Sequence, residues 1–400
     1  MATTRKRGNS YQIRVSVGYD AKGKQVVRTK SWTPDAGMTA KQIEKELLKQ
    51  TIMFEEQCIK GFVTSNIKFE EFTERWFEEY ANVNLKKSTL HRMKACTIRT
   101  YPAFGHLQLQ KITRGQIQAF IDDMARNGKN INTGKPLSQK TVIHHLNFIS
   151  DIFVYAARLE LIDNNPCKNI VVPRGKKKEK SVYTVDEVKN LFALIEEHKP
   201  PIKYKAFVTL AVYSGFRRGE LLGLEWKDID WDNNVISVRR TSNYTSTSGH
   251  YTDTTKTKSS QRSLKLPDAV FDTLKELYEE QQETKVMVGS KWVNSDRLFI
   301  SWDGSPMFCG TPYYWLKKFT KKHNMRFCDL HSFRHFNTTV LINSGIDVAT
   351  VSRALGHANV NTTTSIYFHA FQEVQARTGN AIAEALNLSG NSNTKQKGAV

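Results

Sequence analysis

The sequence predicts a multidomain α+β protein. We expect a small N-terminal module of a β-sheet and a helix, then an all-α bundle, then a mostly α domain with a small antiparallel sheet. Three observations predict this. Apolar and polar residues alternate from Tyr11 to Tyr19, aromatic residues recur at helical spacing from Phe69 to Tyr80, and strand-like runs separate helical segments after Thr184. A length of 400 residues agrees with two or three domains, because single cores seldom exceed about 250–300 residues.

The composition is strongly basic. The chain has 59 Lys+Arg against 39 Asp+Glu, a formal net charge of +20. This excess favours a polyanionic partner (DNA, RNA or an anionic membrane surface), although in many proteins it serves solubility alone. No apolar run approaches the ~18 residues of a membrane span, and we expect no secretory signal. The five cysteines include no C-x-x-C pair, so neither a disulfide framework nor a zinc site is indicated, and we expect a reducing cytoplasm.

Residues 1–62 predict a basic module of a three-stranded sheet and one helix. The first thirty residues contain eight basic side chains against Asp20 alone. Strands are expected at Tyr11–Tyr19 and Gln25–Trp32, and a helix from the N-cap Thr39 to Gly61. With one face of the sheet apolar, we expect three basic side chains to point outward and bind DNA, namely Arg14, Arg28 and Lys30. A merely solvated basic face is an equal alternative.

Residues 65–168 predict an all-α bundle, followed by a linker at 169–181. Helices are expected at Ser88–Ile98, Gly115–Met124 and Ser138–Arg158, with the aromatic stripes in the core. Pro, Gly and a run of charges mark the linker. The linker contains three consecutive lysines, Lys176, Lys177 and Lys178. They suit either a segment that lies along a polyanion or a solvated connection between two domains.

We predict a third domain over residues 182–388 and a flexible tail over the polar stretch 389–400. Helices are expected at Val185–Glu197 and Lys203–Ser214, the second ending at Gly215. Strand-like runs follow at Val235–Arg239 and around Tyr251–Lys265, joined by a Ser/Thr-rich turn, and helices resume near Pro312.

The third domain contains an ordered set of chemically reactive side chains. In chain order they are Arg217, Glu220, Lys256, His331, Arg334, His357 and Tyr367. Each alone is weak evidence, since a single surface lysine or tyrosine usually has no catalytic role. His331 and His335 have a spacing that can hold a metal, but Ser332 replaces the Glu of the zinc-protease pattern and no carboxylate cluster compensates. We therefore predict no metal site.

As a set, these residue types suit phosphoryl transfer. Two arginines can neutralise the non-bridging oxygens of a phosphodiester, which is the main electrostatic demand of that reaction. A tyrosine oxygen can act as the nucleophile and conserve the bond energy in a phosphotyrosine, so that strand rejoining needs no ATP. A lysine or histidine can protonate the leaving 5′ oxygen and later take the proton back.

These motifs resemble those of the tyrosine recombinases, the phage-integrase family. The resemblance lies in Gly215-Phe216-Arg217-Arg218-Gly219-Glu220, Lys256-Thr257-x-x-Ser260-x-Arg262, His331-Ser332-Phe333-Arg334, Leu355-Gly356-His357 and Tyr367. The order of the domains extends it over nearly the whole chain. It implies a site-specific DNA recombinase of the type found in phages and conjugative transposons, with an arm-binding module, a helical core-binding domain and a catalytic domain.

The resemblance also implies a role for each residue. Tyr367 would attack the scissile phosphate and form a 3′-phosphotyrosyl link, while Arg217 and Arg334 bind the phosphate. Lys256 would be the general acid, with Lys258 as a competing choice. In supporting roles, His331 would assist proton transfer, His357 would hydrogen-bond the phosphate, and Glu220 would support the arginines.

The same resemblance implies the partners and leaves alternatives open. It implies double-stranded DNA with core and arm sites, a homotetramer on DNA, a Holliday-junction intermediate, and an excisionase and a host DNA-bending protein as accessory partners. No cofactor, metal or membrane is implied, and the expected location is the bacterial cytoplasm. A type IB topoisomerase and a non-catalytic DNA-binding regulator are the alternatives. After Tyr367 an apolar helical face could dock on a neighbouring protomer or on its own domain: Phe371, Val374, Ala381, Ile382 and Leu386.

Overall fold

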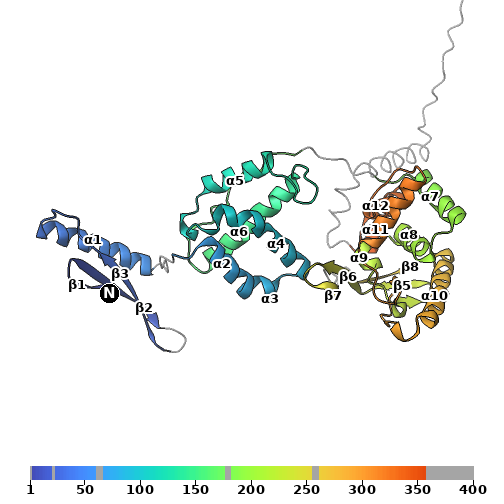
Figure 1. Ribbon diagram of the computed structural model, residues 1–400, viewed down its shortest axis with the longest axis horizontal. Coiled ribbons are helices and arrows are strands. Elements are labelled where there is room, and N and C mark those ends of the chain that lie inside the picture. The colour runs from blue at the N-terminus through green and yellow to red at the C-terminus, as the bar shows by residue number, and fades with distance from the viewer. Residues whose placement is uncertain (1, 20–22, 60–65, 176–181, 255–260, 357–400) are drawn as a thin grey trace, which may run out of the picture. The chain divides into compact units, whose positions relative to one another are not determined.

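The computed structural model describes residues 2–19, 23–59, 66–175, 182–254 and 261–356 (Figure 1). The chain divides into two compact units, Met1–Lys177 and Lys178–Val400. In the first unit, residues 2–59 and residues 66–175 have separate hydrophobic cores. Among the described residues, every helix is too short or too polar to cross a lipid bilayer.

The N-terminal part is a three-stranded antiparallel sheet with one helix on it. Its elements are β1 (Ala2–Arg7), β2 (Ser10–Tyr19), β3 (Gln25–Trp32) and α1 (Ala40–Ile59), with strand order β1-β2-β3. The helix covers one face of the sheet, where Ile13 and Val15 are buried against Phe54 and Cys58 (Figure 1). At its start, the Thr39 hydroxyl accepts from the backbone N–H of Gln42 at 3.4 Å, as expected of an N-cap.

The register of this sheet corrects the expected orientation of two basic residues. Directly opposed residues of an antiparallel pair project from the same face. Lys30 lies opposite Ile13 and Arg28 lies opposite Val15, so both project from the face that α1 covers. Lys30 Nζ donates to Gln50 Oε1 of α1 at 3.1 Å. The prediction that Arg28 and Lys30 point outward from the sheet is therefore wrong.

Arg14 does point away from the helix, and two residues of β1 join it. Arg14 is exposed and lies opposite Thr3 and Thr29, on the uncovered face. The same alternation places Arg5 and Arg7 of β1 on that face, and both are exposed. The outer basic face of the sheet thus consists of Arg5, Arg7 and Arg14.

Residues 66–175 form the expected helical bundle. Its elements are α2 (Phe69–Trp76), the π-helix η1 (Phe77–Ala81), α3 (Asn82–Asn84), α4 (Lys87–Thr100), the π-helix η2 (Tyr101–Gly105), the short η3 (Leu109–Lys111), α5 (Arg114–Arg126) and α6 (Gln139–Arg158). The predicted aromatic stripe is core, since Phe69, Phe72 and Trp76 are buried. Side chains of Thr113 and Ser138 cap α5 and α6, which is why both helices begin where the sequence predicts.

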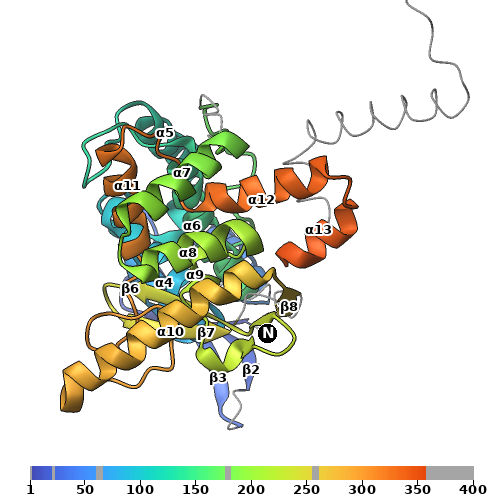
Figure 2. The same cartoon turned by 90° about the vertical axis from the view of Figure 1, so that its right-hand side faces the viewer.

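The second unit is mostly helical, with two small antiparallel sheets (Figure 2). Its helices are α7 (Val185–His198), α8 (Ile202–Ser214), α9 (Arg218–Leu221), α10 (Asp268–Val288), α11 (Thr311–Lys322), α12 (His331–Asn343) and α13 (Val348–Leu355), with the short η4 (Trp226–Asp228) and η6 (Gly289–Lys291). Its strands are β4 (Ile229–Asp230), β5 (Val235–Val238), β6 (Arg240–Thr245), β7 (Gly249–Thr254) and β8 (Arg262–Lys265). Strand β5 pairs with both β4 and β8, whereas β6 pairs only with β7 among the described strands. The predicted fold class is confirmed.

Helix α8 is the centre of this unit. Its residues from Ala206 to Val212 are all buried, and it contacts α10, α11 and α12. It ends at Gly215, which adopts a left-handed conformation with φ of 62°. A helix that is apolar on all sides must lie inside a fold. The buried position of α8 therefore fixes the position of its last turn and of the residues that follow it.

The sequence does not predict helix α10 or strand β6. Helix α10 buries Val270, Phe271, Leu274 and Leu277 in its first half, whereas its second half buries only Gln281 and leaves Tyr278, Val286 and Met287 exposed. Buried apolar residues at helical spacing therefore cover only the first two to three turns after Pro267. Strand β6 lies in the stretch that the sequence predicts as a Ser/Thr-rich turn, because the strand consists mainly of polar residues.

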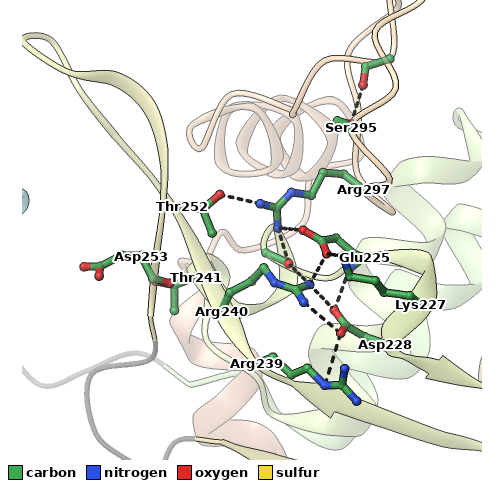
Figure 3. A network of polar contacts seen from close by, with 12 residues as sticks. Glu225, Lys227, Asp228, Arg239, Arg240, Thr241, Thr252, Asp253, Ser295 and Arg297 are labelled. Atoms are coloured by element: carbon green, nitrogen blue, oxygen red, sulfur yellow. Dashed lines mark hydrogen bonds and ion pairs between the residues drawn. The ribbon is translucent and has the colours of Figure 1, made fainter.

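A buried ionic network holds the β6–β7 hairpin to the rest of the unit (Figure 3). Arg240 of β6 forms ion pairs with Asp228 at 2.5 Å and with Glu225 at 2.8 Å. Arg297 reaches Thr252 Oγ1 of β7 at 2.6 Å and lies 3.6 Å from Glu225. Because both arginines share Glu225, the two strands of the hairpin are tied to one carboxylate.

Candidate active site

The structure describes four of the seven predicted site residues. These are Arg217, Glu220, His331 and Arg334, all in the second unit. Lys256, His357 and Tyr367 lie outside the described residues, as do Lys176, Lys177 and Lys178 and the predicted tail at 389–400. The site is therefore described through its arginines and the elements that hold them.

The turn after α8 positions Arg217. A Cβ on Gly215 would lie 2.8 Å from Asn337 Oδ1 and 3.0 Å from a methyl group of Leu355, and the positive φ disfavours other residues as well. Asn337 Nδ2 donates to the carbonyls of Val212 and Tyr213, each at 3.0 Å, and so holds the end of α8. The chain thus turns tightly into α9, for which Arg217 is the N-cap residue.

Glu220 binds two arginines at once. Its carboxylate accepts from the Arg217 backbone N–H at 2.9 Å and from Arg217 Nη1 at 2.7 Å. Arg262 Nη2 of β8 donates to Glu220 Oε2 at 2.9 Å. The carboxylate therefore both caps α9 and orients the side chain of Arg217.

The environment of Glu220 favours its ionised form. The side chain is only 2% exposed. Burial of the carboxyl opposes ionisation, but the Arg262 guanidinium and the hydrogen bonds from Arg262 and Arg217 outweigh burial and hold the pKa of Glu220 below its ordinary value. Glu220 is therefore a fixed negative charge in the folded protein at neutral pH.

Arg334 is buried between the ends of two helices. It lies on α12, and only 3% of the residue is exposed. Its Nη1 donates to the carbonyl of Gly215 at 2.9 Å, and its Nη2 donates to the carbonyl of Leu355 at 2.6 Å. Arg217 Nη2 donates to the next carbonyl, that of Gly356, at 3.3 Å. The two arginines predicted to bind phosphate thus meet at the C-terminal end of α13.

A third arginine reaches the same helix end. Arg262 Nε donates to the carbonyl of Ala354 at 2.5 Å. Successive carbonyls at the end of α13 therefore each accept from a different guanidinium: Ala354 from Arg262, Leu355 from Arg334 and Gly356 from Arg217. The last carbonyls of a helix have no partner within the helix and carry partial negative charge, which the three cations satisfy.

His331 occupies a different position from Arg334 on α12. It is the exposed first residue of the helix, and its ring lies edge-on to that of His335, with 4.7 Å between the centroids. Within the described ranges, no group of three or more His, Cys, Asp or Glu residues has the arrangement of a metal site. The guanidinium groups that meet at the end of α13 suit the binding of an anion.

Two family models match the chain. The phage integrase family matches residues 181–373, and the N-terminal SAM-like domain of phage integrases matches residues 68–125. The first range includes every predicted catalytic residue, and the second includes α2 to most of α5. The chain belongs to the phage integrase family. It is a tyrosine recombinase, an enzyme of site-specific recombination of mobile elements.

Relatives of this recombinase occur in bacteria. The XerC-like tyrosine recombinase of Caldanaerobacter subterraneus is 28% identical over 386 residues, which are 90% of this chain and 92% of the relative. The ICEBs1 integrase of Bacillus subtilis is 27% identical over 391 residues, 96% of this chain and 100% of the relative. The transposase of transposon Tn916 from Enterococcus faecalis is 25% identical over 197 residues, 48% of each chain.

Solved structures share the fold of the recombinase. The Tn1549 transposon integrase (its residues 82–397), solved with a circular intermediate DNA, aligns with a TM-score of 0.63 at 20% identity, over 78% of this chain and 99% of the other. A lambda integrase dimer bound to a COC′ core site aligns with a TM-score of 0.53 at 17% identity, over 90% and 93%.

Sequence reasoning assigned no role to two residues of this site. Arg262 is the last residue of the motif Lys256-Thr257-x-x-Ser260-x-Arg262, and its position two residues after Ser260 is the available signal. Asn337 lies one helical turn after Arg334, on the same side of α12, but nothing in the local sequence indicates that it binds the end of α8.

Replacing Glu220 by glutamine tests its buried charge. We expect Glu220→Gln to lower the free energy of unfolding by about 3 kcal/mol at pH 7, because it leaves buried guanidinium groups without their counter-charge. The folded-state pKa of Glu220 lies below the unfolded value near 4.5, so the stabilisation is present above that pH and is lost as the pH falls through the folded value. Urea unfolding of both proteins at pH 7 and pH 4 should show the difference shrinking in acid.

The matched control is Glu283→Gln, at an exposed position of α10. We expect it to change stability by less than about 0.5 kcal/mol at either pH. A Glu220→Gln protein as stable as the wild type at pH 7 would contradict the assigned role of the carboxylate.

Proposed function

We propose that the recombinase cuts and rejoins DNA through a covalent 3′-phosphotyrosine at Tyr367, with Arg217 and Arg334 binding the scissile phosphate. The observation that supports this most directly is the convergence of both arginines on neighbouring carbonyls at the end of α13, that of Leu355 and that of Gly356. Two arginines that are far apart in the sequence are thus oriented by the same helix end. A phosphodiester needs such a pair of fixed cations on its non-bridging oxygens.

The reaction conserves atoms and charge in two transfers. The Tyr367 hydroxyl gives up its proton, with His331 assisting, as its oxygen attacks the phosphorus; the bond to the 5′ oxygen breaks, and Lys256 gives that oxygen a proton. In the second transfer, a 5′-hydroxyl of another strand returns its proton to Lys256 and attacks the phosphotyrosine, and the Tyr367 oxygen takes a proton back as it leaves. Exchange of one strand pair leaves a Holliday junction, and exchange of the second resolves it. His331 assists proton transfer, His357 hydrogen-bonds the phosphate, and Glu220 holds Arg217.

The proposed division of labour follows the parts of the chain. Residues 65–168 bind the core site of double-stranded DNA, residues 182–388 perform catalysis, and the linker 169–181 lies along the DNA through Lys176, Lys177 and Lys178. Residues 1–62 bind an arm-type site. Integrases of this fold with core-site or circular-intermediate DNA in their structures support DNA as the partner. On DNA we expect a homotetramer in the bacterial cytoplasm, with an excisionase and a host DNA-bending protein as accessory partners.

Covalent trapping tests the nucleophile. A suicide DNA substrate that loses the cleaved 5′ fragment should accumulate a covalent adduct with the wild-type protein. Tyr367→Phe should give none, because it lacks the attacking oxygen, while binding the core site with unchanged affinity. Denaturing gel electrophoresis reads the adduct.

An adduct that persists in Tyr367→Phe, or none in the wild type, would refute the proposed mechanism. Exchange between two DNA sites, measured beside relaxation of a supercoiled plasmid, separates a recombinase from a type IB topoisomerase, which relaxes DNA without exchanging sites.

Neutralising the outer face of the N-terminal sheet tests arm binding. The triple variant Arg5→Gln, Arg7→Gln, Arg14→Gln should weaken arm-site binding and reduce the slope of log K against log salt by about one for each lost phosphate contact. Core-site binding should not change. The matched control is Arg28→Gln with Lys30→Gln, because both residues project toward α1.

Equal weakening by the control pair would contradict the assignment of the DNA-binding face. Deletion of residues 1–62 should abolish the arm-site shift and spare the core-site shift, and loss of neither would refute an arm-binding role.

Removing residues 371–400 tests the proposed tetramer. If the apolar face after Tyr367 docks on a neighbouring protomer, the truncated protein should bind a single core site but form no synaptic complex in analytical ultracentrifugation. Assembly of the truncated protein into tetramers would contradict docking of the segment on a neighbouring protomer.

A further inference from the structure

Arg262 is a buried cation to which the proposed reaction assigns no role. It is the first residue of β8, and its side chain is only 8% exposed. A guanidinium buried to this extent requires hydrogen bonds and counter-charge, since an unpaired buried charge costs several kcal/mol. Its partners show what it connects.

Arg262 joins the start of α9 to the end of α13. Nη2 donates to Glu220 at 2.9 Å, and Nε donates to the carbonyl of Ala354 at 2.5 Å. The guanidinium also packs over the ring of Phe216, 4.7 Å from its centroid. A Cβ at Gly356 would lie 2.8 Å from Arg262 Nη1, so the glycine leaves the space that the guanidinium fills.

The charge of Arg262 matters for Arg217. Glu220 lies 2.7 Å from Arg217 Nη1, and a carboxylate at that distance would by itself neutralise the guanidinium that is to bind phosphate. Arg262 supplies a second positive charge to the same carboxylate. Two guanidiniums and one carboxylate leave a net charge of +1, so that Arg217 is held in place and the site stays attractive to an anion.

We propose that Arg262 is a positioning residue for strand cleavage: through Glu220 it balances the carboxylate that orients Arg217, and through Ala354 it fixes the end of α13 on which Arg217 and Arg334 also converge. Its Nε and Nη2 donate to protein groups, and we therefore assign it no contact with the DNA phosphate. The inference rests on the proposed role of Arg217. It adds that Arg262 offsets the charge of the carboxylate that lies beside this phosphate-binding arginine.

The catalytic test uses single-turnover cleavage of a suicide core-site substrate by the full chain. Arg262→Met should lower the cleavage rate about 100-fold, comparable to the loss of one transition-state donor, with core-site affinity unchanged within about threefold. Arg262→Lys keeps the charge and should recover part of the rate. Adding Glu220→Gln to Arg262→Met should raise the rate about tenfold over Arg262→Met, because the uncompensated carboxylate is gone.

A merely structural role predicts the opposite order. If Arg262 only stabilised the fold, the double variant would be slower than Arg262→Met, since it loses a further buried contact. That order, or a wild-type rate in Arg262→Met, would overturn the proposal.

The control removes another arginine–carboxylate pair of the same unit, one that is more exposed than Arg262 and Glu220. Arg326 contacts Glu187 of α7 through Nε at 2.6 Å and Nη2 at 2.5 Å, away from α9, β8 and α13. Arg326→Met should leave the cleavage rate of the folded protein unchanged within about threefold. A loss as large as that of Arg262→Met would assign the effect to general destabilisation and overturn the proposal.

A measurement without catalysis separates failure of this inference from failure of the proposed function. At pH 7, Glu220→Gln should destabilise the wild-type protein in urea, but it should be neutral or stabilising in the Arg262→Met background. Equal effects in both backgrounds would overturn the coupling of Arg262 to Glu220, whatever the cleavage assay shows. A wild-type protein that forms no adduct refutes the role of Tyr367 and leaves this unfolding result standing.

Discussion

The site depends on the hydrogen bonds that three arginines donate to carbonyl groups at the C-terminal end of α13. A short helix ends with carbonyl groups that have no partner within the helix, and here three of them accept from guanidinium groups. The donors come from the start of α9, from β8 and from α12. Each arginine also contacts another part of the fold. The carbonyls at the helix end therefore fix the distances between the three guanidinium groups as well as the rotamer of each side chain. The segment that contains His357 and Tyr367 follows α13 directly.

Glu220 shows why positive charge alone does not make this site. A long arginine side chain has many rotamers, and a partner is needed to hold it in one of them. The carboxylate is a strong orienting partner, but it also removes charge from the guanidinium that it orients. A second arginine on the same carboxylate, Arg262, reconciles the two requirements. Fixed guanidinium groups with directed N–H donors suit a site that must bind the tetrahedral oxygens of a phosphate.

Local sequence patterns predicted much of the secondary structure. Periodic apolar residues predicted the starts of α5, α6 and α7 to within one residue and the end of α8 at Gly215, because these signals act within one or two turns. Helix α10 was missed because its apolar spacing covers only half its length. In the N-terminal sheet, alternation correctly showed which residues of β2 share a face. It did not show which residues of β3 lie opposite them, so Arg28 and Lys30 were assigned to the wrong side.

The sequence by itself determined the family and the kind of chemistry, because the required residue types occur in the order of the family motifs. The tertiary structure decided which charges meet. Glu220 and Arg262 are 42 residues apart, and Arg217 and Gly356 are 139 apart. No local periodicity encodes such pairs, since they arise only when α8, α9, α12, α13 and β8 pack together. The contact between Arg262 and Glu220 is therefore a property of the fold, although both residues were visible in the motifs.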